Sequence, residues 1–185
     1  MKNSFAYLGP KGTFTEAAFL QMPIAQGADL IPAESVREAL NLVRSGKVFG
    51  ALVPIENSVE GSVATTLDEL GHGDSLEIID EIAIPVEFAL LAKPGVSISD
   101  IKRIATHPHA HAQCVDWLHK NIPGVHVLPA MSTAAAAEEL SECANYEAAI
   151  CSVAAAKHYG LEILAQGIGD SDSAWTRFVL VSKPG

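Results

Sequence analysis

The chain has 185 residues, of which 49% are apolar, and a formal net charge of −10. This length suffices for one large domain or two small lobes whose core needs neither disulfides nor metal. The acidic balance argues against nucleic acid and acidic membranes as partners, although local hydrogen-bond donors can still hold an anionic metabolite. No apolar run approaches the roughly 20 residues of a membrane span.

Cysteine usage and the N-terminus both indicate the cytoplasm. The three cysteines, Cys114, Cys143 and Cys151, match no disulfide or metal spacing, so we expect small core residues in a reducing compartment. The N-terminal residues contain neither a hydrophobic signal region nor a cleavage site. We therefore predict a cytoplasmic protein that contacts neither a membrane nor nucleic acid.

Hydrophobic runs of strand length alternate with amphipathic stretches of helix length, which is typical of α/β proteins with largely parallel sheets. Helices fill most of the gaps between strands, and capping signatures stand at residues 13–16, 35–38 and 132–133. Strands are predicted at residues 4–8, 28–31, 48–53, 76–83, 86–92, 103–105, 126–128, 147–151, 162–165 and 177–182.

The order strand, helix, strand, helix, strand occurs in residues 1–55 and again in residues 103–151. Two similar α/β lobes are the economical interpretation. If the last strand returns to the first lobe, lobe 1 comprises residues 1–78 and 168–185, and lobe 2 comprises residues 79–167. The expected fold class is α/β, with two lobes of mixed, mostly parallel sheets and a ligand site in the cleft between them.

The apolar run at residues 49–53 gives way abruptly to Glu56, Asn57, Ser58 and Gly61. In open α/β sheets, ligands bind beyond the carboxyl ends of strands. The three polar side chains therefore offer different hydrogen-bonding groups to a ligand, and the glycine lets the backbone approach it. The alternative is an ordinary loop in which Asn57 or Ser58 caps a helix that starts a few residues later.

Three other segments carry groups that suit an anion. The loop after the first strand opens a helix with Thr13, but it lacks the glycine pattern of nucleotide-binding loops. Ser132 and Thr133 begin a second helix and form a candidate carboxylate receptor. Arg177, beside Thr176 at the entrance of the last strand, is a candidate partner for a substrate carboxylate. The alternatives are a plain turn and helix cap at Thr13, a helix cap at Ser132 and Thr133, and the start of a surface strand at Arg177.

Segment 107–114 contains three histidines and a cysteine, a composition that also occurs in zinc sites. No carboxylate or second cysteine completes a ligand set at a typical spacing, so we expect no metal. We expect His109 and His111 to face solvent. If a helix begins near His109, Gln113 shares its face and presents an amide to a ligand.

Taken together, five motifs resemble those of the prephenate dehydratases in order and spacing, and the set spans nearly the whole chain. The resemblance implies a fold like that of type II periplasmic binding proteins. It also implies a carbon–oxygen lyase that converts prephenate to phenylpyruvate, water and carbon dioxide in L-phenylalanine biosynthesis, within the chorismate pathway. The motifs are Gly9-Pro10-Lys11-Gly12-Thr13-Phe14-Thr15, Pro54-Ile55-Glu56-Asn57-Ser58 with Gly61, His107-Pro108 with Gln113-Cys114, Ser132-Thr133-Ala134, and Thr176-Arg177-Phe178.

The same resemblance implies roles for individual residues. Thr176 supplies the hydrogen bond or proton to the leaving hydroxyl, and Arg177 holds a carboxylate or polarises the site. Loss of the ring carboxylate and hydroxyl is driven by aromatisation, so orientation and proton donation suffice, and neither cofactor nor metal is expected. The substrate contacts are expected to be Thr13, Glu56, Asn57, Ser58, Gln113, Ser132 and Thr133.

Two features distinguish this sequence from many members of that family. Ser173 and Ala174 stand where an asparagine often precedes the Thr-Arg-Phe motif. Many members also continue into a regulatory ACT domain, so the sequence looks like the catalytic region alone. An arogenate dehydratase, or a non-catalytic two-lobed protein that binds an anionic metabolite, is the alternative. We further expect the chain to form a homo-oligomer.

Overall fold

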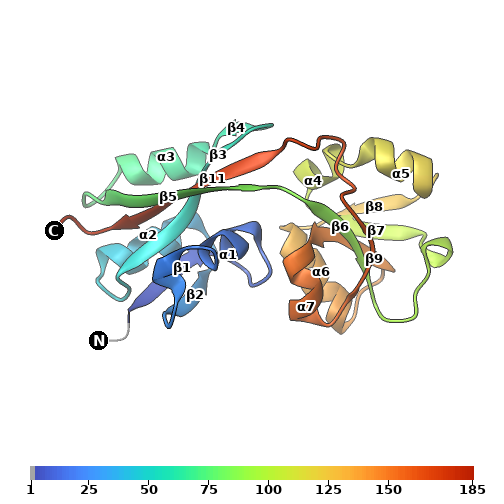
Figure 1. The fold of residues 1–185 in the computed structure, drawn as a ribbon, viewed down its shortest axis with the longest axis horizontal. Coiled ribbons are helices and arrows are strands. Elements are labelled where there is room, and N and C mark those ends of the chain that lie inside the picture. The colour runs from blue at the N-terminus through green and yellow to red at the C-terminus, as the bar shows by residue number, and fades with distance from the viewer. Residues whose placement is uncertain (1–2) are drawn as a thin grey trace. The chain divides into compact units, whose positions relative to one another are not determined.

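The structure, a computed structural model, describes residues 3–185. The chain forms two compact units, each with its own sheet (Figure 1). Unit 1 comprises Met1–Pro10, Phe14–Pro85 and Ala174–Gly185, and unit 2 comprises Lys11–Thr13 and Val86–Ser173.

Unit 1 is built on a mixed sheet in the order β2-β1-β3-β11-β5, in which β11 runs against the other four strands. The short strand β4 pairs with β3 beside this path. The strands are β1 (Ser4–Leu8), β2 (Asp29–Ala33), β3 (Gly50–Asn57), β4 (Gly61–Ser62), β5 (Glu77–Pro85) and β11 (Trp175–Ser182), and the helices are α1 (Phe14–Phe19), η1 (Pro23–Ala25), α2 (Val36–Arg44) and α3 (Ala64–Gly71).

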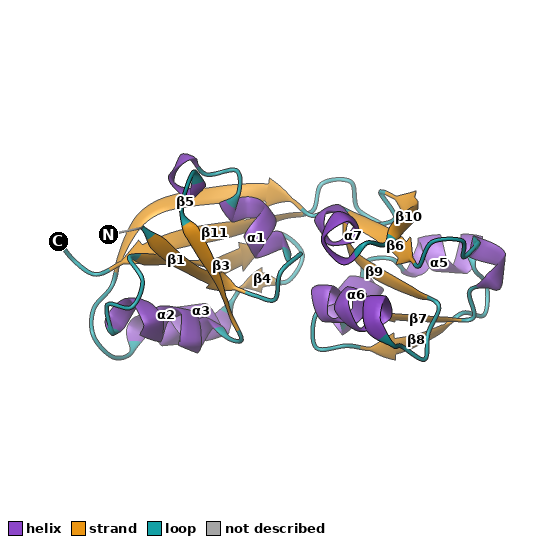
Figure 2. Cartoon of the chain, turned by 90° about the horizontal axis from the view of Figure 1, so that it is seen from below, coloured by secondary structure: helices purple, strands orange, loops and turns teal. Residues whose placement is uncertain are grey.

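Helices cover both faces of this sheet, with α1 on one face and α2 and α3 on the other (Figure 2). Successive side chains of a strand point to opposite faces, so β3 supplies both cores. Leu52 packs in one core with Leu180 and Phe19 of α1. Val53 packs in the other core with Leu40 of α2. Burial on both faces explains why the middle of β3 is continuously apolar.

Unit 2 has a mixed sheet in the order β10-β6-β9-β7-β8, in which β6 runs against the other four strands. Alanines of α6 and α7 pack on one face of it, and α4 and α5 lie on the other side (Figure 1). The elements are β6 (Phe88–Ala92), η2 (Ile98–Asp100), β7 (Arg103–Thr106), α4 (Pro108–Ala112), α5 (Val115–Asn121), β8 (His126–Pro129), α6 (Thr133–Glu142), β9 (Ala148–Ser152), α7 (Val153–Tyr159) and β10 (Glu162–Gln166).

Every predicted strand is present, but the unit boundaries differ from residues 78/79 and 167/168. β5 pairs with β11 over its whole length, from Glu77 opposite Ser182 to Pro85 opposite Trp175, so unit 1 extends to Pro85. The segment before β11 stays with unit 2 through Ser173 because Ile168 is fully buried there and its N–H binds the Phe88 carbonyl. The cysteine prediction is wrong for Cys143, which is exposed, whereas the other two cysteines are buried.

Glu147 joins the beginnings of β7 and β9 in unit 2. One carboxylate oxygen accepts hydrogen bonds from the backbone N–H groups of Lys102 and Arg103 at 3.1 and 2.8 Å, and the other accepts from the Arg103 guanidinium at 2.8 Å. The Arg103 hydrogen bond, which outweighs the opposing effect of burial, holds the pKa of Glu147 below its ordinary value of 4.5. Charged Glu147 therefore stabilises the folded state.

Glu147→Gln should lower the free energy of unfolding by about 1–2 kcal/mol at pH 7, because it weakens charge-assisted hydrogen bonds. A folded-state pKa below the unfolded value means that this contribution is complete above the ordinary pKa and is lost as pH falls through the folded-state pKa. Urea unfolding, measured from pH 7 down through the folded-state pKa of Glu147, should show the free energies of unfolding of the wild type and the variant converging in acid. Glu138→Gln removes an equal charge from an exposed position on α6 and should have little effect at pH 7.

Candidate active site

Antiparallel pairing in unit 1 brings together two polar segments that are distant in sequence. β3 ends at Asn57 and β11 begins at Trp175, so Thr176 lies opposite Asn57 and Arg177 lies opposite Glu56. A register shift between Arg177 and Phe178 leaves Ile55 as an extra residue on β3. Such bulges redirect side chains at the ends of strands.

The Thr176 hydroxyl is the centre of this arrangement. The residue is 9% exposed, and its Oγ1 accepts a hydrogen bond from Asn57 Nδ2 at 2.9 Å. The amide of Asn57 is oriented in turn, because its Oδ1 accepts from the N–H groups of Val59 and Glu60 at 2.8 and 3.0 Å. Since Thr176 Oγ1 already accepts from an N–H, its own hydrogen is available for donation to another molecule.

Ser58 fixes the entrance of β11. Its N–H donates to the Trp175 carbonyl and its hydroxyl accepts from the Trp175 N–H, both at 2.9 Å. The alternative in which Asn57 or Ser58 caps the next helix is wrong, because β4 intervenes and the N-cap position of α3 is Val63. Both side chains instead organise the β3 and β11 ends.

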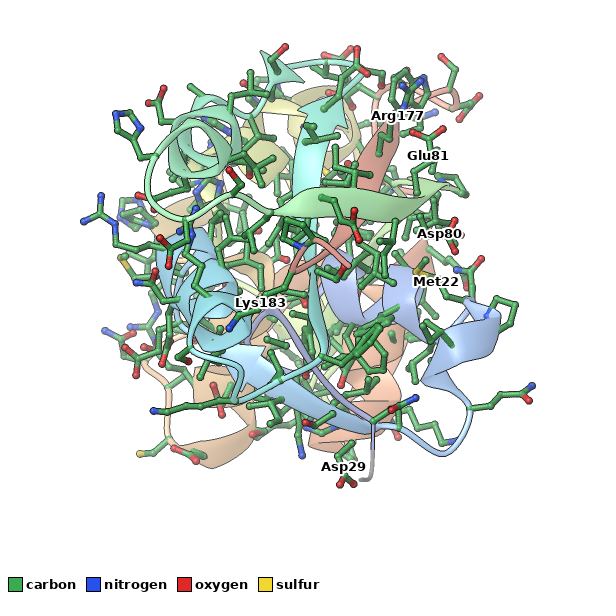
Figure 3. The ribbon with its side chains drawn as sticks, turned by 90° about the vertical axis from the view of Figure 1, so that its left-hand side faces the viewer. Met22, Asp29, Asp80, Glu81, Arg177 and Lys183 are labelled. Atoms are coloured by element: carbon green, nitrogen blue, oxygen red, sulfur yellow. The ribbon has the colours of Figure 1, made fainter. Side chains whose placement is uncertain are left out.

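Arg177 is about half exposed and lies in an acidic setting. Its Nε is 3.8 Å from a Glu56 carboxylate oxygen, and its guanidinium carbon is 5.7 Å from the centroid of the Trp175 ring. Figure 3 shows Arg177 on β11 beside the edge strand β5, which carries Asp80 and Glu81. The partial exposure of the Glu56 pair makes it weak, so an anion that displaces Glu56 loses little by doing so.

The predicted residues of unit 2 follow the carboxyl ends of strands that run in one direction. Ser132 and Thr133 follow β8, and Gln113 ends the α4 segment after β7. Ser132 caps α6, as predicted, because its hydroxyl accepts from the Ala135 N–H at 2.9 Å. Burial raises the pKa of the neighbouring Cys151 thiol to about 11, against the smaller effect of its hydrogen bond with Thr133.

Thr13 belongs to a segment that is anchored at the end of β9. The Gly12 carbonyl accepts from the Ser152 hydroxyl, and the Lys11 carbonyl accepts from the Tyr159 hydroxyl, both at 2.7 Å. Gly12 has a φ of +81°, and a Cβ there would lie 3.2 Å from Ala155. Glycine is therefore required both by the backbone conformation and by the close approach to α7.

The histidine segment forms α4 and its flanks. His109 is exposed and His111 is partly exposed, and the Gln113 Nε2 donates to the His109 carbonyl at 3.2 Å, so one of its two hydrogens is occupied. Within residues 3–185, no three or more His, Cys, Asp or Glu side chains are arranged to hold a metal ion. No helix in that range is long and apolar enough to span a membrane.

Sequence reasoning missed Asp170 and Ser152. Ser152 caps α7 and could have been recognised, because a serine at a strand end followed by a helix with Gly160 after it is a standard capping pattern. Asp170 accepts from backbone N–H groups of α5, more than 50 residues away, at 3.3 Å. Its only signal was that Cys114, before α5, is a poor cap.

Comparison with known proteins decides the family. The sequence model described as prephenate dehydratase matches residues 5–185. The chain belongs to the prephenate dehydratase family. It is 43% identical to a Mycobacterium marinum prephenate dehydratase over 188 residues, which covers 97% of this chain and 59% of the relative. It thus spans about three fifths of the curated relatives it matches.

Solved structures agree with the family and the fold. A prephenate dehydratase from Arthrobacter aurescens in complex with L-Phe is 51% identical with a TM-score of 0.93, covering 98% of this chain and 60% of that one. GqqA, described as a novel type of quorum quenching acylase, is 30% identical with a TM-score of 0.86, covering 98% and 64%. A periplasmic substrate-binding protein of a Coxiella burnetii ABC transporter, 12% identical over 99% of this chain and 85% of that one with a TM-score of 0.52, shares the fold alone.

Proposed function

We propose that the chain catalyses the decarboxylating dehydration of prephenate to phenylpyruvate, a carbon–oxygen lyase reaction in phenylalanine biosynthesis. One observation carries this proposal beyond family membership. The buried Thr176 hydroxyl accepts from Asn57 Nδ2, which leaves an O–H donor at the start of β11. A leaving hydroxyl needs such a donor.

Besides a proton donor, the reaction requires only that the protein orient the substrate. The bond between the ring and its carboxylate breaks, and carbon dioxide leaves while the electron pair enters the ring. The bond to the ring hydroxyl breaks on the opposite side, and the hydroxyl departs as water after gaining a proton. Aromatisation drives both steps, so no cofactor is needed, and the enzyme orients the dianion and delivers the proton. The reaction consumes one proton overall, and the donor regains its proton from solvent.

We assign the donor role to Thr176 and assign Arg177 to a substrate carboxylate, which would displace its weak contact with Glu56. The Asn57 N–H polarises the threonine hydroxyl, because hydrogen bonds in a chain strengthen one another. Further substrate contacts are proposed for Glu56, Ser58, Thr13, Gln113, Ser132 and Thr133. The predicted homo-oligomer, the cytoplasmic location and the absence of nucleic-acid or membrane partners stay predictions.

Purified protein should form phenylpyruvate from prephenate, with activity that survives exhaustive chelation. Arogenate in a parallel reaction, with phenylalanine as the measured product, separates the two dehydratase activities. Acylase activity without turnover of prephenate or arogenate would instead match the description of GqqA. Tight binding of prephenate without product would contradict catalysis and favour a binding protein.

A further inference from the structure

Asp170 joins the segment before β11 to the end of α4 through its backbone and to the start of α5 through its side chain. Its N–H donates to the Gln113 carbonyl at 2.7 Å. Its two carboxylate oxygens accept from the N–H groups of Asp116 and Trp117 at 3.3 Å each. One residue therefore contacts both the end of α4 and the first turn of α5.

This remote carboxylate accepts hydrogen bonds from the first turn of helix α5. The N-cap residue of α5 is Cys114, whose side chain makes no capping hydrogen bond. The first N–H groups of a helix have no partner within the helix and attract negative charge. Asp170 supplies that charge from another segment. Cys114 reports its proximity, because burial and then the Asp170 charge raise the pKa of the thiol to about 12.

Gln113 lies at the junction that Asp170 braces. It is the C-cap of α4, and the next residue is the N-cap of α5. Its own Nε2 is held by the His109 carbonyl. The hydrogen bonds of Asp170 fall on either side of this junction, on residue 113 itself and on residues 116 and 117, so they restrain the backbone that carries the Gln113 side chain.

We propose that Asp170 is a positioning residue that sets the orientation of Gln113 toward the substrate. The inference rests on the proposed function, in which Gln113 contacts prephenate. Asp170 acts only through Gln113 and does not touch the reacting atoms. Loss of its carboxylate lets the α4–α5 junction relax, and substrate binding then weakens while the chemical step at Thr176 is affected less.

Asp170→Ala should lower kcat/KM for prephenate about tenfold, mostly through KM, as expected for loss of uniform binding. Asp170→Asn keeps one acceptor oxygen, so its kcat/KM should lie between those of the wild type and Asp170→Ala. This variant preserves the test if the alanine variant does not fold. Asp172→Ala is the matched control, because this exposed aspartate is in the same loop and should leave kcat/KM unchanged.

A double-mutant cycle with Gln113→Ala distinguishes positioning from general destabilisation. In the Gln113→Ala background, Asp170→Ala should reduce kcat/KM less than about twofold, because its target is already gone. An undiminished tenfold loss there, or a wild-type kcat/KM in Asp170→Ala alone, overturns the proposal.

Hydrogen exchange of the Asp116 and Trp117 amides tests the contact without any activity. Exchange should accelerate in Asp170→Ala and stay unchanged in Asp172→Ala, because Asp170 is the aspartate of this loop that accepts from these two N–H groups in the structure. Unchanged exchange in Asp170→Ala overturns the contact itself. A wild-type protein that does not turn over prephenate overturns the proposed function, and with it this role, even where exchange behaves as expected.

Discussion

Thr176→Val is expected to lower kcat for prephenate by about 100-fold or more while KM changes little, the pattern of a lost proton donor. Valine matches the shape of threonine and suits a strand, so packing beside the core should survive at a residue that is 9% exposed. The Asn57 Nδ2 loses its acceptor, which costs about 1 kcal/mol of stability. Steady-state kinetics and thermal unfolding measure the two effects separately.

Thr176→Ser is the control for this substitution, because it keeps the hydroxyl and removes the methyl group. Serine should retain most of kcat, within roughly tenfold of the wild type, since the Asn57 N–H can still orient its Oγ. A valine variant with near-normal kcat would remove Thr176 from the mechanism. Equal losses in the serine and valine variants would show that the hydroxyl alone does not account for the effect, because serine keeps the hydroxyl and valine keeps the methyl group.

The fold was largely predictable because strand-length apolar runs alternate regularly with helical stretches. The end of β3 could not be predicted in the same way, because the strand contains Pro54. A proline lacks the N–H that a central strand needs, so it argues for ending the strand at Val53. In the structure the strand continues to Asn57, because a bulge at Ile55 absorbs the irregularity and the Pro54 carbonyl binds the Thr66 hydroxyl at 2.6 Å.

The candidate site was predicted as a set of residues and not as a set of interactions. The order of the motifs identified both Asn57 and Thr176 as candidates. The sequence around each residue does not show that they share a hydrogen bond across 119 positions. The antiparallel register between β3 and β11 creates that contact, and the bulge shifts this register by one residue. Asp170 was missed for a similar reason, because its partners are backbone N–H groups, which carry no residue-specific signal.

Asn57→Asp should reverse the direction of the hydrogen bond to Thr176. An aspartate can still accept from the Val59 and Glu60 N–H groups, so the turn after β3 is kept. It cannot donate to Thr176, whose hydroxyl must then donate to the new carboxylate instead of the leaving group. We expect kcat to fall roughly 100-fold or more, within the range for loss of a general acid. Asn41→Asp, which adds the same charge on α2, should leave kcat unchanged.

Asn57→Ala should have the opposite balance of effects from Asn57→Asp, with a larger loss of stability and a smaller loss of kcat. Alanine removes both turn hydrogen bonds, so it should destabilise unit 1 more than aspartate does, by about 1 kcal/mol. It leaves the Thr176 hydroxyl free to donate, so it should reduce kcat only about tenfold through lost orientation. In a Thr176→Val background, the difference in kcat between the two variants should nearly vanish, since no hydroxyl remains to be misdirected. If Asn57→Ala has the lower kcat of the two, or if the difference persists without the hydroxyl, Asn57 does not act through the proton of Thr176.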